Sequence, residues 1–162
     1  MKSCLPLVTL LLLMLLCAHA VHAQQLTVIN DDGAKVVFDQ SAIARLPHVK
    51  LTAGSPPGST FEGIALRSIL EKAGIRFGDT LKGKRLASYL LASGADVFRV
   101  VIALPELDPS FTDKQVLLAF LQDGKPLAPK EGPFRIVMPD EKRMSRWVKQ
   151  VTALTIVDAP QQ

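Results

Sequence analysis

The sequence from Val116 to Val148 constrains the fold more than any other part of the chain. An apolar run leads to a polar turn at Asp123-Gly124, and a second apolar run lies between Pro133 and Pro139. A basic segment follows and contains the one tryptophan. Each apolar run is shorter than the ~20 residues of a membrane span and has the length of a buried strand or a turn of core helix. Proline lacks a backbone N–H, so both prolines suit the ends of a strand.

Several short motifs in and before this stretch occur in the order of a known family pattern. The motifs are Phe61-Glu62-Gly63-Ile64-Ala65-Leu66-Arg67-Ser68-Ile69-Leu70, Leu117-Leu118-Ala119, Gly124-Lys125-Pro126-Leu127, Pro133-Phe134-Arg135, Pro139 and Arg143-Met144-Ser145-Arg146-Trp147. In this order they resemble the oxidoreductase molybdopterin-binding domain, the fold of sulfite oxidase and its bacterial relatives. The resemblance covers Phe61 to Val157 and implies an α+β, mostly-β domain with a few short helices.

The pattern of the remaining segments favours the same class. Residues of alternating or β-branched character predict strands, and apolar spacing after a capping Asp39 or before Gly74 predicts short helices. The strands are expected at 25–29, 35–38, 49–52, 86–91, 97–102 and 151–157, the helices at 39–44 and 65–73, and a loop at 53–60. Strands and helices do not alternate regularly, which favours an α+β or mostly-β domain.

Residues 1–23 have the pattern of a secretory signal. Lys2 precedes an apolar core from Leu5 to Leu16, and small residues lead to an expected cleavage site after Ala23. We therefore expect residues 24–162 to form a single periplasmic or secreted domain without a membrane span. A membrane anchor is the alternative, but the apolar core is short of the ~20 residues that a span needs. Lipidation at Cys17 is a further alternative, disfavoured by the bulky Leu16 before it.

Both cysteines of the sequence, Cys4 and Cys17, lie in the segment that we expect to be removed. Without them the exported chain has no thiol for a disulfide, a Cys-ligated metal or a Cys nucleophile. The formal net charge of the whole sequence is only +4. Such a mild excess of basic residues, together with export, argues against nucleic acid as a partner.

The resemblance implies a molybdenum cofactor, but one residue that it needs is missing. Family members hold the metal through a Cys upstream of the Leu-Leu-Ala run, because a soft sulfur ligand suits it and tunes its potential. Residues 49–60 supply no Cys, and Glu131 stands where the family has a His. Arg143 and Arg146 match the family positions that meet the pterin phosphate, and Arg135 matches its strand arginine. We therefore expect no metal and no cofactor, although the resemblance keeps molybdopterin as an alternative.

The basic segment has two interpretations. Arginine can donate two parallel hydrogen bonds to a phosphate, so Arg135, Arg143 and Arg146 are candidate cofactor- or anion-binding residues. Alternatively, the segment is a solvated basic face whose aliphatic stems cover the core. Trp147 is expected to be a core residue in either case.

A second group of polar residues surrounds a strand-to-strand turn, and it is a candidate ligand-binding cleft. In this cleft Arg99 would take an anion, which Asp96 or Glu106 would orient. The group consists of Tyr89, Ser93, Asp96, Arg99 and Glu106. The alternative interpretation is ordinary turn chemistry with a surface ion pair.

We expect a protein that is not a Cys-ligated molybdenum enzyme, and we nominate no catalytic residue. Its function would be to bind a small anionic ligand, or a periplasmic or membrane protein partner. One alternative is a molybdopterin-dependent oxidoreductase that holds its cofactor without a protein thiolate. Another is an accessory subunit of a membrane sensor or redox system. The sequence has neither a Gly-x-Ser-x-Gly elbow nor a dinucleotide-binding fingerprint.

Overall fold

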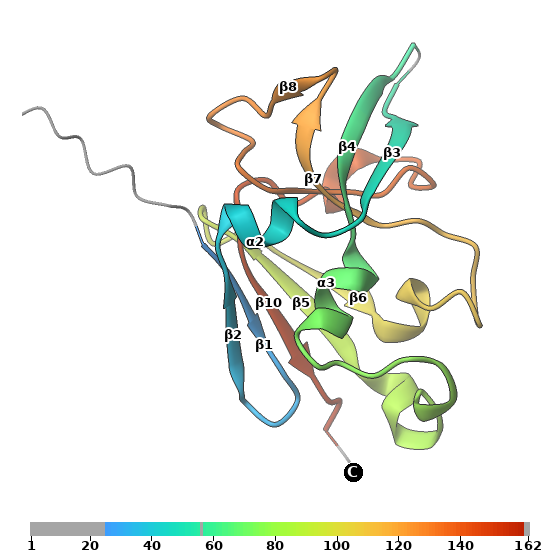
Figure 1. Ribbon diagram of the computed structural model, residues 1–162. Helices are drawn as coiled ribbons and strands as arrows, with labels where there is room; N and C mark the ends of the chain where they lie inside the picture. Colours follow the sequence, from blue (N-terminus) through green and yellow to red (C-terminus); the bar gives the residue numbers. More distant parts are fainter. Residues whose placement is uncertain (1–24, 56, 161–162) are drawn as a thin grey trace, which may run out of the picture.

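The computed structural model describes residues 25–55 and 57–160, which form two five-stranded sheets. Sheet A has the strand order β2-β1-β10-β5-β6, and sheet B has the order β3-β4-β7-β8 with β9 also paired to β7. Figure 1 shows sheet B in the upper part of the molecule and sheet A below it. The described residues add two short α-helices and four 3-10 turns, which confirms the expected α+β, mostly-β class. The expected signal segment, 1–23, lies outside the described residues.

Sheet A joins the two ends of the described chain. Its strands are β1 (Leu26–Ile29), β2 (Lys35–Phe38), β5 (Tyr89–Gly94), β6 (Arg99–Ala103) and β10 (Val151–Val157). β1 runs parallel to β10, with Thr27 opposite Ala153, and the other pairs are antiparallel. Alternation in the sequence therefore predicted β1 and β10 correctly, and the apolar, β-branched run at 35–38 predicted β2.

Sheet B is built from β3 (His48–Ala53), β4 (Ser59–Ala65), β7 (Leu117–Gln122), β8 (Lys125–Pro126) and β9 (Arg135–Val137). Its strands pair antiparallel, and the β4–β7 ladder has an irregularity between Glu62 and Gly63. A Cβ at Gly63 would collide with the Leu118 carbonyl oxygen and lie 2.6 Å from the Cα of Ala119. The close approach of the two strands thus requires glycine at this position.

The helices and turns connect the sheets. α2 (Gln40–Ala44) begins after Asp39, whose side chain accepts a hydrogen bond from the Ala42 N–H. α3 (Leu66–Lys72) buries Leu66, Ile69 and Leu70, as the apolar spacing predicted. The 3-10 turns are η2 (Gly78–Thr80), η3 (Gly83–Ala87), η4 (Leu104–Leu107) and η5 (Met144–Arg146).

Three boundaries differ from the sequence-based expectation. The loop expected at 53–60 is shorter, because β4 already begins at Ser59 and continues to Ala65. The strand expected from Leu86 begins at Tyr89, since residues 83–87 form η3, which Arg85 ties to Asp31. The strand expected from Val97 begins at Arg99, because Val97 has a left-handed φ of 60° and belongs to the preceding turn.

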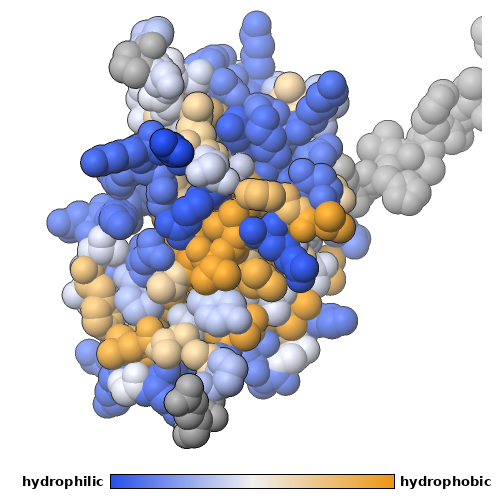
Figure 2. Space-filling view, turned by 180° about the vertical axis from the view of Figure 1, so that it is seen from behind, coloured by the Kyte–Doolittle hydropathy of each residue, from blue (hydrophilic) through white to orange (hydrophobic). Residues whose placement is uncertain are grey.

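The core lies between the sheets and under α3 and includes Phe134, Leu90 and Ile136, all fully buried. Apolar surface also remains outside: Figure 2 shows apolar side chains gathered near the middle of one face, with hydrophilic side chains around them. Val37 on β2 and Val101 on β6 are both more than half exposed. No helix within residues 25–55 and 57–160 has the length and apolar character to cross a membrane.

Candidate functional site

The tip of the β3–β4 hairpin and the segment after β9 enclose a hollow of about 450 Å³, called here the β3–β4 pocket. Ala53 and Gly54 come from the end of β3, and Phe61 comes from β4. Arg135 of β9 and Trp147 form the opposite wall. The pocket thus collects residues from three parts of the sequence, including the basic segment and residues 49–60.

Arg135 is the buried cation of the β3–β4 pocket. Its side chain is 9% exposed, and its Nη1 lies 3.0 Å from Oε2 of Glu131. Its guanidinium carbon lies 5.7 Å from the ring centre of Phe61 and 5.2 Å from that of Trp147. Two aromatic faces and one carboxylate therefore stabilise the charge, in the geometry of cation–π contacts. Its Nε is buried without a hydrogen-bond partner within the described residues.

The Glu131 carboxylate forms ion pairs with both neighbouring cations, Arg135 and Lys149. Besides Arg135, its carboxylate contacts Lys149, whose Nζ is 2.9 Å from Oε1. Burial pushes the pKa of Glu131 upward, but Lys149 and Arg135 outweigh it and hold that pKa below its usual range. The carboxylate is therefore ionised at neutral pH, and two cations share one anion, which leaves the local charge positive.

Trp147 is a core residue, as the sequence predicted. It is 4% exposed, and its Nε1–H donates to the Met138 carbonyl oxygen at 3.1 Å. Its ring meets Phe61 edge to face, with ring centres 5.7 Å apart. The ring of Trp147 thus packs in the core and also contributes to the wall of the β3–β4 pocket.

Arg146 lies away from the β3–β4 pocket, against the edge of sheet A. Its Nη1 donates to Glu141 at 2.6 Å, and its Nη2 donates to the carbonyl oxygen of Val101 on β6 at 2.9 Å. Glu106 lies 3.6 Å from the same Nη2. Arg146 therefore covers part of an edge strand that would otherwise expose unpaired backbone groups.

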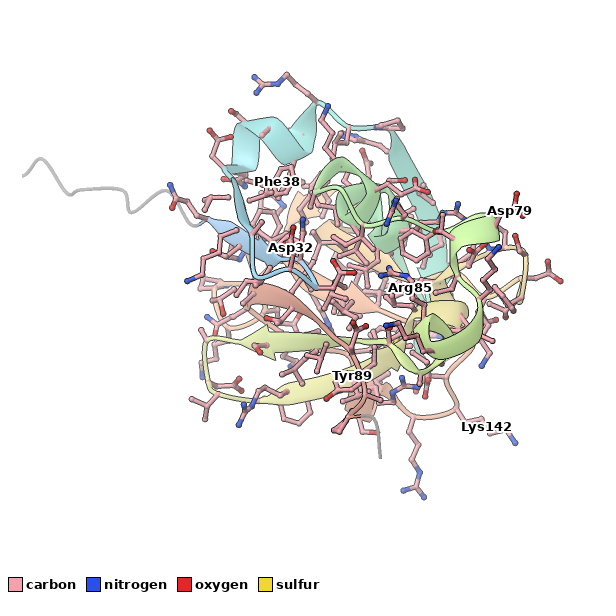
Figure 3. The ribbon with its side chains drawn as sticks, turned by 90° about the horizontal axis from the view of Figure 1, so that it is seen from below. Asp32, Phe38, Asp79, Arg85, Tyr89 and Lys142 are labelled. Atoms are coloured by element: carbon pink, nitrogen blue, oxygen red, sulfur yellow. The ribbon has the colours of Figure 1, made fainter. Side chains whose placement is uncertain are left out.

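Arg143 is exposed, and it makes no side-chain hydrogen bond or ion pair to residues 25–55 or 57–160. The neighbouring Lys142 points away from the body of the molecule in Figure 3. The structure thus places Arg135 inside the β3–β4 pocket, Arg146 at the edge of sheet A, and Arg143 in solvent. The three arginines do not converge on one point, and a cofactor-binding role for Arg143 and Arg146 stays a prediction.

The second predicted group spreads along the β5–β6 hairpin. Ser93 stands opposite Arg99, while Tyr89 stands opposite Ala103 at the other end of the ladder. Asp96 accepts from the Phe98 N–H within the turn. Glu106 accepts from the Ala103 N–H at the start of η4 and faces Arg146. The hollows of about 450 and 340 Å³ are lined by other residues, and one of about 20 Å³ includes Glu106 alone of this group, so none of these three hollows brings the five side chains together.

Arg146 and Arg143 differ in their contacts, so we expect their alanine variants to differ in stability. Arg146→Ala should lower the free energy of unfolding by about 1–2 kcal/mol, because it removes the charged hydrogen bonds of a side chain that is only 32% exposed. Arg143→Ala should change it by less than about 0.5 kcal/mol. Urea unfolding of both variants measures this. Equal losses would contradict the placement of Arg146 against β6.

A search of solved structures finds the same fold in a larger enzyme. The sulfane dehydrogenase SoxCD from Paracoccus pantotrophus superposes with a TM-score of 0.65 and 20% sequence identity, covering 83% of this chain and 38% of that one. Identity at this level shows the fold alone, and it confirms the sulfite oxidase-like architecture expected from the motifs.

Sequence comparisons supply the family. Residues 32–162 match the model described as the oxidoreductase molybdopterin binding domain, and the chain belongs to that family. Two curated relatives are the inducible nitrate reductases [NADH] 1 and 2 of Glycine max, which are 32% and 30% identical over 109 and 112 residues. Those matches cover 60% of this chain but only 12% and 11% of the relatives.

The donor atoms of the β3–β4 pocket do not fit a thiolate-held molybdenum. The end of β3, within the stretch where the resemblance expects the Cys, presents Ala53 and Gly54 to the pocket. The sulfur atom in its lining belongs to Met144, a neutral thioether, which is a poor substitute for a thiolate. Residues 25–55 and 57–160 contain no cluster of three His, Cys, Asp or Glu that could hold a metal.

Proposed function

We propose that the protein is an exported, non-catalytic member of the molybdopterin-binding domain family that binds a small anionic ligand in the β3–β4 pocket. The observation that supports this most is the pairing of Arg135 and Lys149 around a single Glu131, beside a stretch, residues 49–60, that supplies no Cys for a metal. The local positive charge favours an anion. The buried rings of Phe61 and Trp147 form an apolar wall beside Arg135, and a charged contact is stronger in surroundings of low polarity.

The rival function is that of an oxidoreductase that holds molybdopterin without a protein thiolate. The family match favours it, because the matched region includes every wall of the β3–β4 pocket. The anionic groups of a molybdopterin in this pocket would have to compete with Glu131 for Arg135. The two functions therefore predict different contents of the purified protein.

Metal analysis separates the two functions. The 162-residue chain, with its N-terminal segment, is produced in a bacterial host that makes the cofactor and is purified from the periplasmic fraction. We expect far less than one molybdenum per chain and no pterin fluorescence after oxidation. One molybdenum per chain, with pterin, would show that the rival is correct. Recovery in the cytoplasm alone would contradict the proposed export.

Anion titration tests the ligand site itself. Inorganic sulfate should perturb the backbone amides of Ser59, Arg135 and Trp147 in a saturable manner. Lys149→Gln should weaken this binding several-fold. Arg135 is then the one cation paired with Glu131, and the local excess of positive charge is lost. Lys142→Gln removes the same charge on a side chain that points into solvent, so it is the matched control. Equal weakening in both variants would indicate a non-specific charge effect.

A further inference from the structure

A second hollow, of about 340 Å³, lies between β3, the start of α3 and the segment that leads into β7; we call it the Arg67 pocket. Its walls are mostly apolar, with Val49 and Leu51 from β3, Ala65 before α3, and Leu107 and Val116 from the opposite side. It shares no lining residue with the β3–β4 pocket. Apolar hollows with a few polar groups at the rim are the usual form of small-molecule sites.

Buried polar contacts hold the walls of the Arg67 pocket in place. Asp108 is fully buried and accepts from Arg67 at 3.0 Å, from the Gly78 N–H at 2.6 Å and from the Ser110 N–H at 3.0 Å. The Leu66 N–H donates to the Val116 carbonyl oxygen at 2.8 Å. These contacts tie the turn after β6 and the entry to β7 to α3. A site that is already formed costs a ligand little ordering free energy.

The charged side chains that line the Arg67 pocket each have an opposite charge close by. The Arg67 guanidinium contacts Asp108 and Glu71, and it lies 5.0 Å from the ring centre of Phe77. At the rim, Asp113 and Lys114 carry opposite charges on adjacent residues. Because the guanidinium in the lining is already paired, a charged ligand would be buried against apolar walls without a free partner, at a cost in desolvation free energy. Thr112 and Gln115 add neutral hydrogen-bonding groups to the lining.

We infer that the Arg67 pocket is a second binding site, for a small uncharged molecule with an apolar ring or short alkyl body and one hydrogen-bonding end. The body packs against Val49, Leu51 and Val116. The polar end lies at the rim, near Thr112. The site is independent of the anion site in the β3–β4 pocket, because the two are lined by separate residues and differ in charge.

The test uses three ring compounds that differ in charge: 4-methylphenol, which is uncharged at pH 7, and benzoate and benzylamine, which are charged. Each is titrated into the ¹⁵N-labelled chain. We expect 4-methylphenol to shift the amides of Val49, Leu51, Ala65 and Val116 in a saturable manner, and both charged compounds to bind at least tenfold more weakly. No saturable shift, or equal affinity for all three, overturns the inference. Shifts confined to Ser59, Arg135 and Trp147 would assign the compound to the β3–β4 pocket and overturn it as well.

Variants locate the site. Ala65→Leu fills the hollow from its floor and should weaken 4-methylphenol binding at least tenfold, while Ser59→Ala in the β3–β4 pocket should leave it unchanged. Thr112→Val keeps the side-chain shape but removes the rim hydroxyl, and should weaken binding several-fold. If Ala65→Leu does not fold, Val49→Phe on the half-buried edge strand fills the same space. Undiminished binding by a folded, filled variant overturns the inference.

Discussion

Asp108→Ala is expected to lower the free energy of unfolding by about 3–5 kcal/mol, although no sequence motif marks this residue. The carboxylate is fully buried, and it is the acceptor for two backbone N–H groups and for the Arg67 guanidinium. Its removal leaves two backbone N–H groups and one Arg67 nitrogen without this acceptor at partly buried positions, and unsatisfied groups there carry much of the cost of their desolvation. Chemical denaturation monitored by circular dichroism measures the loss.

A matched variant separates the charge from the hydrogen bonds. Glu71→Ala removes the other carboxylate that contacts Arg67, but Glu71 is 44% exposed. It should cost less than about 1 kcal/mol, as exposed i,i+4 pairs do. A similar loss in Glu71→Ala and Asp108→Ala would mean that the Arg67 charge, and not the burial of Asp108, determines the effect.

The same contacts predict acid sensitivity. Burial pushes the pKa of Asp108 upward, but hydrogen bonds from Ser110 and Gly78 and the Arg67 charge outweigh it, so the pKa lies below its usual range. A carboxyl whose pKa is lower when folded stabilises the protein above its unfolded pKa of about 3.9, and this stability is lost as the pH falls through the folded value. Asp108→Asn should therefore have a shallower loss of stability between pH 5 and 2, a range around that reference value. Some slope remains because the pKa values of Asp31 and Glu131 are also lowered.

Local sequence signals predicted much of the fold. β1, β2, β10, α2 and α3 follow from alternation, capping and apolar spacing, each of which acts over a few residues. The parallel pairing of β1 with β10 does not follow from such signals, because it joins residues more than a hundred positions apart. The sequence predicted a loop for Ser59 and Thr60, since Gly58 and Ser59 look like turn residues, but both residues belong to β4 and pair with β3, Ser59 opposite Ala53 and Thr60 opposite Thr52.

The candidate site was less predictable than the fold. The basic segment suggested converging arginines, yet Arg146 turns toward Val101, Glu106 and Glu141, and only the folded chain brings the first two of these close. Glu131 stood out in the sequence as a departure from the family His. Its spacing of four residues from Arg135 was available as a signal for their ion pair, whereas its contact with Lys149 was not. Asp108 precedes Pro109, a pattern common in turns, and only its burial identifies it as a structural anchor.

Trp147→Ala should cost about 3–5 kcal/mol of unfolding free energy, as expected for a large aromatic side chain removed from a core. The change removes the packing on Phe61, the hydrogen bond to Met138 and one of the two rings that face Arg135. Trp147→Phe keeps most of the apolar volume but loses the indole N–H, so it should cost about 1–2 kcal/mol.

Unfolding of both variants has to be followed by circular dichroism, because the sequence has a single tryptophan and neither variant keeps its fluorescence. Because Trp147 also lines the β3–β4 pocket, its removal should weaken sulfate binding there. The weakening should be larger in Trp147→Ala than in Trp147→Phe. An unaltered denaturation midpoint in Trp147→Ala would contradict the core placement of this ring. A destabilised variant that still binds sulfate as tightly as the parent would instead show that the anion does not depend on the aromatic wall around Arg135.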